Sequence, residues 1–236
     1  MQLTVEGPNP GDFPWTIVVS EDRHDLDLVS AIGDAVEAAQ DHDPNGAVQL
    51  WIRDVDDAAH AAADSLGFVQ YRDLWQLRCS LPNADSGLTT RAFRPSDLED
   101  FVRVNNRAFH WHPEQGGLTV EAVRATMTED WFDPDGFRML LSDATDESAE
   151  LIGFCWTKVH LDTEPPLGEI YVIAIDPDQH GRGLGKPMTL AGLEWLAGKG
   201  LQHGMLYVES DNDPANATYA ALGFSRHHTD RAYRLG

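Results

Sequence analysis

The sequence predicts a mixed α/β fold built from two related αβ units, the first of them incomplete. Short apolar runs typical of strands alternate along the chain with helical segments that begin at capping residues, which is the order expected of a sheet covered by helices. Residues 50–68 also match residues 206–224 at one constant spacing, 156 positions from Leu50 to Leu206, without a gap. A chain of 236 residues that is 42% apolar is long enough to bury two modest cores.

The repeat comprises a strand, a helix and the start of a further strand. Its two copies share Leu, Asp, Ala, Ala, Leu, Gly and Phe at matching places, and the same spacing pairs the apolar run 15–19 with 171–175. The second copy begins near Leu88, after a stretch of linker composition, so we expect the first copy to lack roughly the first 68 residues of the unit. We therefore expect a truncated N-terminal domain over residues 1–82, a linker over 83–87 and a complete domain over 88–236.

Each element of the second copy has a local signal. Ser96 caps a helix whose first turn is acidic, Thr119 caps another, and Gly200 ends a third. An acidic turn over residues 143–150 separates two apolar strands. The predicted strands cover residues 88–94, 137–141, 151–160, 169–175, 205–209 and 231–235, and the predicted helices cover residues 96–108, 119–128, 183–199 and 214–222.

Charge and cysteine content exclude several classes of function. A net charge of −22 repels nucleic acid and anionic membranes but leaves room for a small phosphorylated ligand where cations and backbone amides gather. The only cysteines, Cys79 and Cys155, fit neither a disulfide framework nor a zinc spacing and suit a reducing compartment. No apolar run approaches the ~18 residues of a membrane span, and the first residues lack the pattern of a secretory signal. We therefore expect a cytoplasmic protein that binds neither nucleic acid nor membrane.

A glycine-rich turn between a predicted strand and a predicted helix is the clearest functional signal. It contains three glycines at alternate positions, Gly181, Gly183 and Gly185. Glycines let the backbone approach a ligand closely, and the free amides at the start of a helix attract an anion. Arg182 and Lys186 add positive charge. The spacing is neither a Rossmann fingerprint nor a nucleotide P-loop, so we expect a phosphate site of another kind, with a turn that serves only packing as the alternative.

The order of elements around this turn resembles the GNAT acyltransferase family. In that family a strand, a glycine-rich turn and a helix are followed by a second strand and a second helix, as here with Tyr219 on the last helix and Leu-Gly-Phe at residues 222–224. The family pattern is Gln or Arg, two residues, Gly, one residue, then Gly or Ala. Gly183 and Gly185 match it, whereas His180 stands in place of the Gln or Arg. Because backbone amides bind most of the pyrophosphate in that family, the resemblance still implies a coenzyme A site.

Further motifs narrow the resemblance to the tandem GNAT acetyltransferases of mycothiol biosynthesis. The resemblance implies two GNAT-like domains, the first truncated and degenerate and the second complete with a mixed, splayed central sheet. It also implies that acetyl passes from acetyl-CoA to the cysteinyl amine of cysteinyl-glucosaminyl-inositol, the last step of mycothiol biosynthesis. The motifs are NNRAFHWHPEQGG (105–117), WFDP (131–134), FCWTKVH (154–160), GEIYV (168–172) and LYVESDN (206–212), in this order.

The resemblance also implies roles for particular residues. Acetyl-CoA is expected between the strands 169–175 and 205–209, with its pyrophosphate in the glycine-rich turn. Glu169 is expected to take a proton from the amine, and Tyr219 to protonate the departing CoA thiolate. Glu114, Lys158 and Glu169 are expected to bind the amine substrate. The expected coenzyme contacts are Ile173, Ala174, Ile175, His180, Gly181, Arg182, Gly183, Leu184, Gly185, Lys186, Tyr207, Asn212, Pro214, Ala215, Asn216 and Ala217.

Without the resemblance, simpler interpretations of these residues stay open. Glu169 is then a solvated acid at a strand end, and Tyr219 a packing residue on an amphipathic helix. His110, His112 and Glu114 lack further ligands at a recognisable spacing, so we expect no metal. Cys155 lies in an apolar strand without a paired histidine, so we expect an inert core thiol.

The first copy is expected to lack a coenzyme site. At the repeat spacing the glycine-rich turn falls on residues 24–29, which contain two aspartates and no glycine, the base position on Phe13 and the acid position on Ala63. We therefore expect one acetyl-CoA per chain, and we expect a monomer. The alternative functions are acetylation of another small amine or a peptide N-terminus, and coenzyme A binding without turnover.

Overall fold

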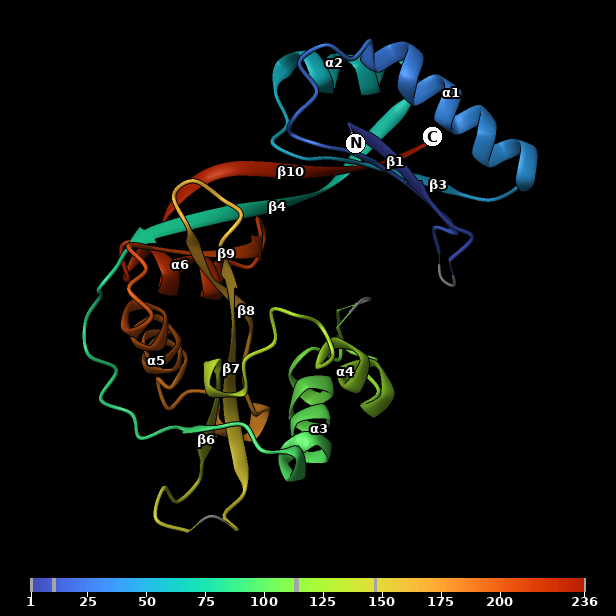
Figure 1. Cartoon of the computed structure of the whole chain (residues 1–236). Helices are drawn as coiled ribbons and strands as arrows, with labels where there is room; N and C mark the ends of the chain where they lie inside the picture. The colour runs from blue at the N-terminus through green and yellow to red at the C-terminus, as the bar shows by residue number, and fades with distance from the viewer. Residues whose placement is uncertain (1, 10–11, 113–114, 147, 236) are drawn as a thin grey trace. The chain divides into compact units, whose positions relative to one another are not determined.

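A computed structural model describes residues 2–9, 12–112, 115–146 and 148–235 (Figure 1). Spatial contacts divide the chain into two compact units. The first consists of Met1–Leu77, Val208–Asp213 and Arg226–Gly236, and the second of Arg78–Tyr207 and Pro214–Ser225. The domain limits drawn from the sequence, with a linker over residues 83–87, stay a prediction.

The first unit contains a mixed sheet. Its strands are β1 (Leu3–Glu6), β2 (Trp15–Val19), β3 (Val48–Ile52), β4 (Phe68–Ser80) and β10 (Ser225–Leu235), in the spatial order β1-β2-β3-β10-β4. β2 and β3 run parallel with Ile17 opposite Leu50, and β3 and β10 run antiparallel with Leu50 opposite Tyr233. The last strand of the chain therefore belongs to the sheet that its first residues form.

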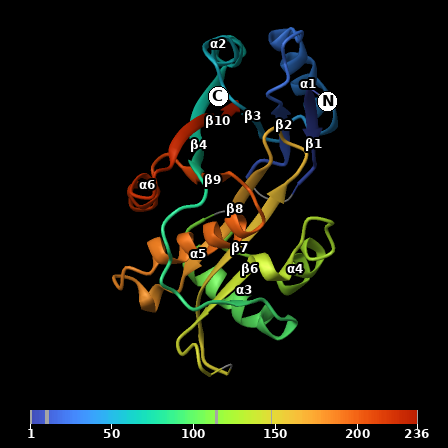
Figure 2. The same ribbon diagram turned by 60° about the vertical axis from the view of Figure 1, so that its left-hand side comes forward.

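Two helices cover one face of this sheet, α1 (Leu28–His42) and α2 (Asp57–Ser65) (Figures 1 and 2). Each begins at an aspartate that caps it: Asp27 accepts a hydrogen bond from Ser30 N at 3.2 Å, and Asp56 from Ala59 N at 2.7 Å. Apolar side chains of the helices and of the sheet form a common core. Its largest fully buried members are Ile17, Ile32, Leu50, Ile52 and Tyr233.

The second unit contains strands β5 (Arg91–Ala92), β6 (Phe137–Leu141), β7 (Leu151–His160), β8 (Leu167–Ile175) and the first part of β9 (His203–Glu209), in the spatial order β9-β8-β7-β6-β5. β8 and β9 run parallel, and the other neighbours run antiparallel. The helices are α3 (Leu98–Ala108), α4 (Val120–Thr126), α5 (Gly185–Gly198) and α6 (Asp213–Ala220). Short 3₁₀ turns lie at Pro95–Asp97, Pro134–Gly136 and Pro177–Gln179.

Helices pack on both faces of this sheet, with α5 on one and α3 and α4 on the other (Figures 1 and 2). On the α3 face, the Phe101 ring meets the edge of Trp156 at a centroid distance of 5.9 Å. On the α5 face the approach is so close that a Cβ on Gly192 would lie 2.4 Å from Cys155 Sγ. Because side chains alternate along a strand, Trp156 and Lys158 share the α3 face, and Cys155 lies on the α5 face.

Most predicted elements of the second copy are confirmed within two residues, and several of the differences have physical reasons. The strand expected over residues 88–94 is reduced to Arg91–Ala92, because Arg138 donates to the Thr90 carbonyl oxygen at 2.7 Å and so replaces a ladder bond. α5 begins two residues late, because Gly183 has a φ of +73° that no right-handed helix accepts. β10 is longer than predicted and begins at Ser225.

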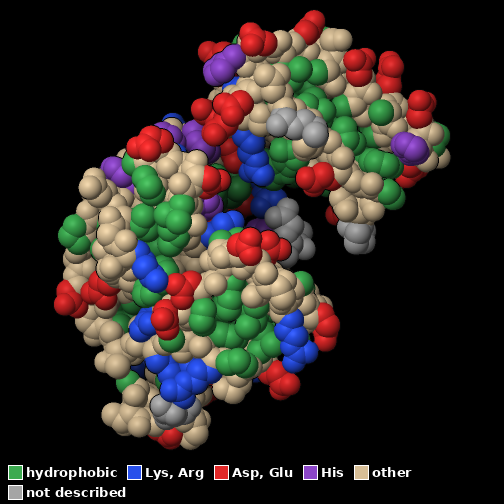
Figure 3. All heavy atoms as spheres, viewed as in Figure 1, with side chains coloured by type: hydrophobic (Ala, Val, Ile, Leu, Met, Phe, Trp, Pro, Cys, Tyr) green, Lys and Arg blue, Asp and Glu red, His purple; other side chains and the backbone are tan. Residues whose placement is uncertain are grey.

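The surface is acidic, as the net charge implies. Figure 3 shows Asp and Glu side chains distributed over the visible face of each unit. In the described part of the chain, no helix combines the length and the apolar character that crossing a bilayer requires.

Candidate active site

Strands β8 and β9 run side by side only at their beginnings. They pair from Gly168 opposite Gly204 to Ile170 opposite Leu206, and the described residues of the two strands have no later pairing. At the next residue, Tyr171, a β-bulge interrupts the pairing of β8 with β7. The end of β8 therefore continues along an edge that β9 no longer occupies. The predicted coenzyme contacts Ile173, Ala174 and Ile175 lie on this part of β8.

The glycine-rich turn is an exposed loop between β8 and α5. Gly181 and Gly183 have φ values of +79° and +73°, in the left-handed region that residues with a side chain avoid. α5 begins at Gly185, and no described side chain caps its N-terminus. Its first amides and the helix dipole therefore favour an anion at this end, and the exposed side chains of Arg182 and Lys186 add two cations.

An arginine of α3 holds the residues that lead into this loop. Asp176, at the end of β8, is 3% exposed, and its Oδ2 lies 3.2 Å from Nη1 of Arg107. Arg107 also donates from Nη2 to Asp178 at 2.8 Å, and this bond raises the pKa of Arg107. His180, which replaces the Gln or Arg of the family pattern, lies with Nε2 3.1 Å from the Ile175 carbonyl oxygen. The loop is thus anchored at its entrance and open at its glycines.

Glu169 is a buried carboxylate bonded to a histidine. Its side chain is 10% exposed, and Oε2 lies 2.7 Å from Nε2 of His160, the last residue of β7. Lys158 stands opposite Glu169 in the sheet, so that Lys158, His160 and Glu169 share the α3 face. His160 holds one carboxylate oxygen, whereas Oε1 has no hydrogen-bond partner among the described residues. This oxygen is available to accept a proton.

The ammonium of Lys158 lies against aromatic rings. Nζ is 4.6 Å from the ring centroid of Trp131 and 5.9 Å from that of Tyr171, which are cation–π distances. No described carboxylate lies within ion-pair distance of it. Burial raises the pKa of Tyr171, and the negative charge of Glu169 raises it further. Lys158 is therefore a cation without an acidic partner beside Glu169, which suits contact with a polar ligand.

Tyr219 is a neutral hydrogen-bond donor held in apolar surroundings. It lies on α6, is 9% exposed, and its ring centroid is 5.6 Å from that of Phe224. Burial raises the pKa of Tyr219 to about 12. Its hydroxyl has no hydrogen-bond partner among the described residues. Burial also raises the pKa of Cys155 far above its ordinary value, which agrees with an inert core thiol.

The other predicted site residues lie outside the described residues, on β9, or around the start of α6. Glu114 lies outside the described residues. Tyr207 is an exposed residue of β9. The described residues contain no group of three or more His, Cys, Asp or Glu that could hold a metal ion. The coenzyme contacts expected next to β9 lie just ahead of α6 or on it: Asn212, Pro214, Ala215, Asn216 and Ala217.

Comparison with protein families decides the class of this fold. The model of the Acetyltransferase (GNAT) family matches residues 99–224, more than half of the chain. The chain belongs to the GNAT family. A mycothiol acetyltransferase of Nocardia farcinica is 45% identical over 195 residues, which cover 78% of this chain and 63% of that relative. One of Rhodococcus erythropolis is 43% identical over 212 residues, 86% of this chain and 70% of the relative. The chain thus spans about two thirds of the length of these relatives.

Solved GNAT structures share the fold. A GCN5-related N-acetyltransferase from Sphaerobacter thermophilus superposes with a TM-score of 0.73 at 19% identity, over 98% of this chain and 75% of that one. A tandem GNAT protein from the clavulanic acid biosynthesis pathway gives a TM-score of 0.68 at 18% identity, over 98% and 77%. The expected mixed α/β fold of GNAT type is therefore confirmed for the chain.

Sequence reasoning assigned no role to two residues of this candidate site, His160 and Tyr171. A signal for His160 was available, because it follows Lys158 by two residues on a predicted strand and so shares its face. The position of Tyr171 had no local signal, because a bulge depends on the pairing of two strands distant in sequence.

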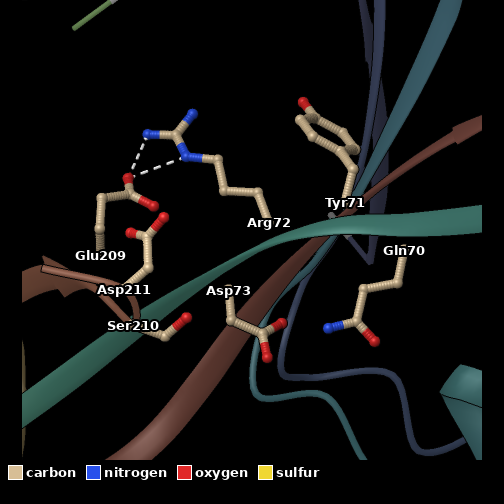
Figure 4. Close-up of a pocket in the computed structure, with 7 residues that line it drawn as sticks. All are labelled: Gln70, Tyr71, Arg72, Asp73, Glu209, Ser210 and Asp211. Atoms are coloured by element: carbon tan, nitrogen blue, oxygen red, sulfur yellow. Dashed lines mark hydrogen bonds and ion pairs between the residues drawn. The ribbon is translucent and has the colours of Figure 1, made fainter. Parts of the chain in front are cut away.

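A cavity of about 380 Å³ lies in the first unit and is shown in Figure 4. Arg72 donates from Nε and Nη2 to Oε1 of Glu209 at 2.8 and 2.5 Å, and the Asp211 carboxylate points toward this pair. Asp73 also accepts hydrogen bonds from Arg231 of β10, at 2.7 and 2.9 Å. None of the described lining residues is a predicted site residue. These ion pairs join β4 to its neighbours, which is a structural role.

Proposed function

We propose that the chain is an acetyl-CoA-dependent N-acetyltransferase whose acceptor is the cysteinyl amine of cysteinyl-glucosaminyl-inositol, the reaction that completes mycothiol. The observation that carries the proposal is the position of Glu169. Its buried carboxylate shares one face of the sheet with Lys158, and it lies one residue before the last pair of β8 with β9. The identity of 43–45% to mycothiol acetyltransferases supports the choice of acceptor.

The coenzyme site proposed here is the edge of β8 together with the loop that follows. The thioester end would lie beside Ile173, Ala174 and Ile175, where an extended pantetheine arm can pair with a free strand edge. The pyrophosphate would lie on the amides of residues 180–186, with the start of α6 on the other side of the arm. Open space where a Cβ would be added at Gly181, Gly183 and Gly185 supports a close approach of phosphate to the backbone.

The proposed mechanism needs a base and an acid. An acceptor ammonium with a pKa near ~8 must lose one proton before its nitrogen can attack the thioester carbonyl. Glu169 takes this proton on Oε1, directly or through water, while His160 keeps Oε2 in place. When the C–S bond breaks, Tyr219, which is protonated at neutral pH, gives its phenolic proton to the CoA thiolate. Lys158 binds acceptor hydroxyl or carbonyl oxygens.

We propose that the first unit is a degenerate GNAT half without a coenzyme site. The order β2, α1, β3, α2, β4 resembles the order β8, α5, β9, α6, β10, and the repeat spacing relates the two. The counterpart of the glycine-rich turn contains Asp25 and Asp27, and the Asp27 side chain caps α1 by accepting from Ser30 N, so a carboxylate already occupies this helix end. We also propose that the protein is monomeric and cytoplasmic.

A panel of acceptors tests the proposed function. Acetylated product is measured by chromatography with acetyl-CoA and one amine at a time: cysteinyl-glucosaminyl-inositol, glucosaminyl-inositol without the cysteinyl group, a peptide with a free N-terminus, and an aminoglycoside. We expect the highest kcat/KM for the first amine. Preference for another amine would replace the acceptor but keep the chemistry, and coenzyme binding without acetylation of any amine would contradict an enzymatic role.

A further inference from the structure

The second unit contains a small cavity that the reaction above leaves unused. It has a volume of about 210 Å³ and lies between α3, α4 and the strands β7 and β8. The rings of Phe101, Trp156 and Tyr171 form part of its wall, and Asn105 and Thr126 are polar members of it. None of its described lining residues carries a charge. Pockets for drug-sized ligands have ~300–1,000 Å³, so this one suits a single small uncharged group.

This cavity adjoins Glu169. Trp156 and Lys158 alternate on β7 and face α3, on the same side as the Glu169 carboxylate. Tyr171 lines the cavity and also lies against the ammonium of Lys158, 5.9 Å from ring centroid to Nζ. The Tyr171 and Trp156 ring centroids are 5.6 Å apart. Through Tyr171 the cavity lies next to the region of Lys158 and Glu169, close enough for one acceptor molecule to occupy both.

Trp156 provides a hydrogen-bond donor that the described residues do not use. The residue is 3% exposed, and its ring stacks on Phe137 with centroids 4.4 Å apart and planes 8° apart. Its Nε1 is buried and has no hydrogen-bond partner in the described part of the chain. A buried N–H without an acceptor is costly, and most such groups in folded proteins are paired. The indole ring, rather than this inaccessible N–H, is the part of Trp156 that can line the cavity.

We propose that this cavity receives the CH₂–SH side chain of the acceptor's cysteinyl group, with the thiol sulfur against Trp156 and its neighbouring rings. The inference rests on the proposed function. Sulfur packs favourably against aromatic rings, and Phe101, Trp156 and Tyr171 supply them here. An uncharged lining favours the thiol over the thiolate, so the amine is the group that loses its proton to Glu169. The cavity thus selects the aminoacyl group of the acceptor.

Three acceptors that differ only in this side chain test the inference: the cysteinyl, alanyl and serinyl amides of glucosaminyl-inositol. With the wild-type protein we expect kcat/KM for the cysteinyl acceptor to exceed that for the alanyl acceptor by about 10-fold or more, the discrimination that an apolar pocket gives. Equal values for the two would overturn the inference and leave the proposed function intact. If none of the three is acetylated, the proposed function fails as well.

A pair of tryptophan substitutions locates the selectivity. Trp156→Phe shortens the aromatic wall of the cavity, so we expect the cysteinyl-to-alanyl ratio of kcat/KM to fall about fivefold. Trp195→Phe, on α5 and outside the cavity lining, is the matched control and should leave the ratio unchanged. An unchanged ratio in Trp156→Phe would overturn the assignment. A variant that instead changes the preference between acetyl-CoA and propionyl-CoA would also overturn it, because the cavity would then hold the acyl group. The wild-type acceptor series decides the matter even if Trp156→Phe does not fold.

Discussion

Replacing Gly183 and Gly185 by alanine separately should have different consequences for coenzyme binding, although both glycines lie in the same turn. Gly183 has a φ of +73°, and no atom lies within 4 Å of an added Cβ, so the whole cost of Gly183→Ala is backbone strain. For an L-residue in the left-handed region that cost is about 1–2 kcal/mol. If the loop relaxes when free and must return to this shape to bind phosphate, coenzyme affinity falls about 5- to 30-fold.

Gly185→Ala is the matched control. Gly185 is the first residue of α5, is not among the positive-φ glycines and also has open space at the Cβ position. Alanine favours helix over glycine, and the family pattern accepts Ala at this place, so we expect an unchanged Kd for coenzyme A and an equal or higher Tm. Isothermal titration with coenzyme A and thermal unfolding measure both variants. An unchanged Kd in Gly183→Ala, or equal losses in both variants, would refute the reasoning from backbone geometry.

The remaining predictions concern the proton-transfer groups and the coenzyme count. Glu169→Gln should lower kcat/KM by 10²-fold or more at neutral pH and less at pH above ~8, where free amine is abundant; a loss that does not change with pH removes Glu169 from the base role. His160→Ala should lower kcat roughly tenfold with little change in the KM for acetyl-CoA, and His160→Gln should recover most of it by donating an amide N–H; equal losses in both variants would mean that His160 does not act through its bond to Glu169. Tyr219→Phe should lower kcat by about 10²-fold with an unchanged coenzyme Kd, and because burial raises the pKa of Tyr219 to about 12, the wild-type rate should show no loss from its ionisation below pH 10; full activity in Tyr219→Phe returns the residue to packing. Titration should give one acetyl-CoA per chain and none after Gly183→Asp with Gly185→Asp, whereas two per chain would give the first unit a site.

The sequence was most informative where the local signal and the tertiary environment agree. Residues 137–141 and 151–160 form strands with the predicted limits, because buried apolar runs bounded by turn residues have few other conformations. The glycine-rich turn was also predictable, since glycine, strand and helix signals all lie within a short segment of the chain.

Pairing between distant segments was not predictable in the same way. The first half of β10 is polar, beginning Ser-Arg-His-His-Thr-Asp, and forms a strand because neighbouring strands supply hydrogen bonds. The bond between His160 and Glu169 depends on the register of β7 and β8, which is set by turn length and a bulge. The assignment of residues 226–236 to the first unit likewise follows from a long-range pairing that no local pattern encodes.

The most direct test of the central claim is the identity of the product. The protein is incubated with acetyl-CoA that carries a ¹³C-labelled carbonyl and with cysteinyl-glucosaminyl-inositol, and the products are analysed by NMR and mass spectrometry. We predict that one equivalent of coenzyme A appears for each labelled acetamide on the cysteinyl nitrogen, with the thiol free, and that Glu169→Gln forms this acetamide far more slowly at neutral pH. Label that appears only as free acetate, or on a sugar or inositol hydroxyl, would contradict the account.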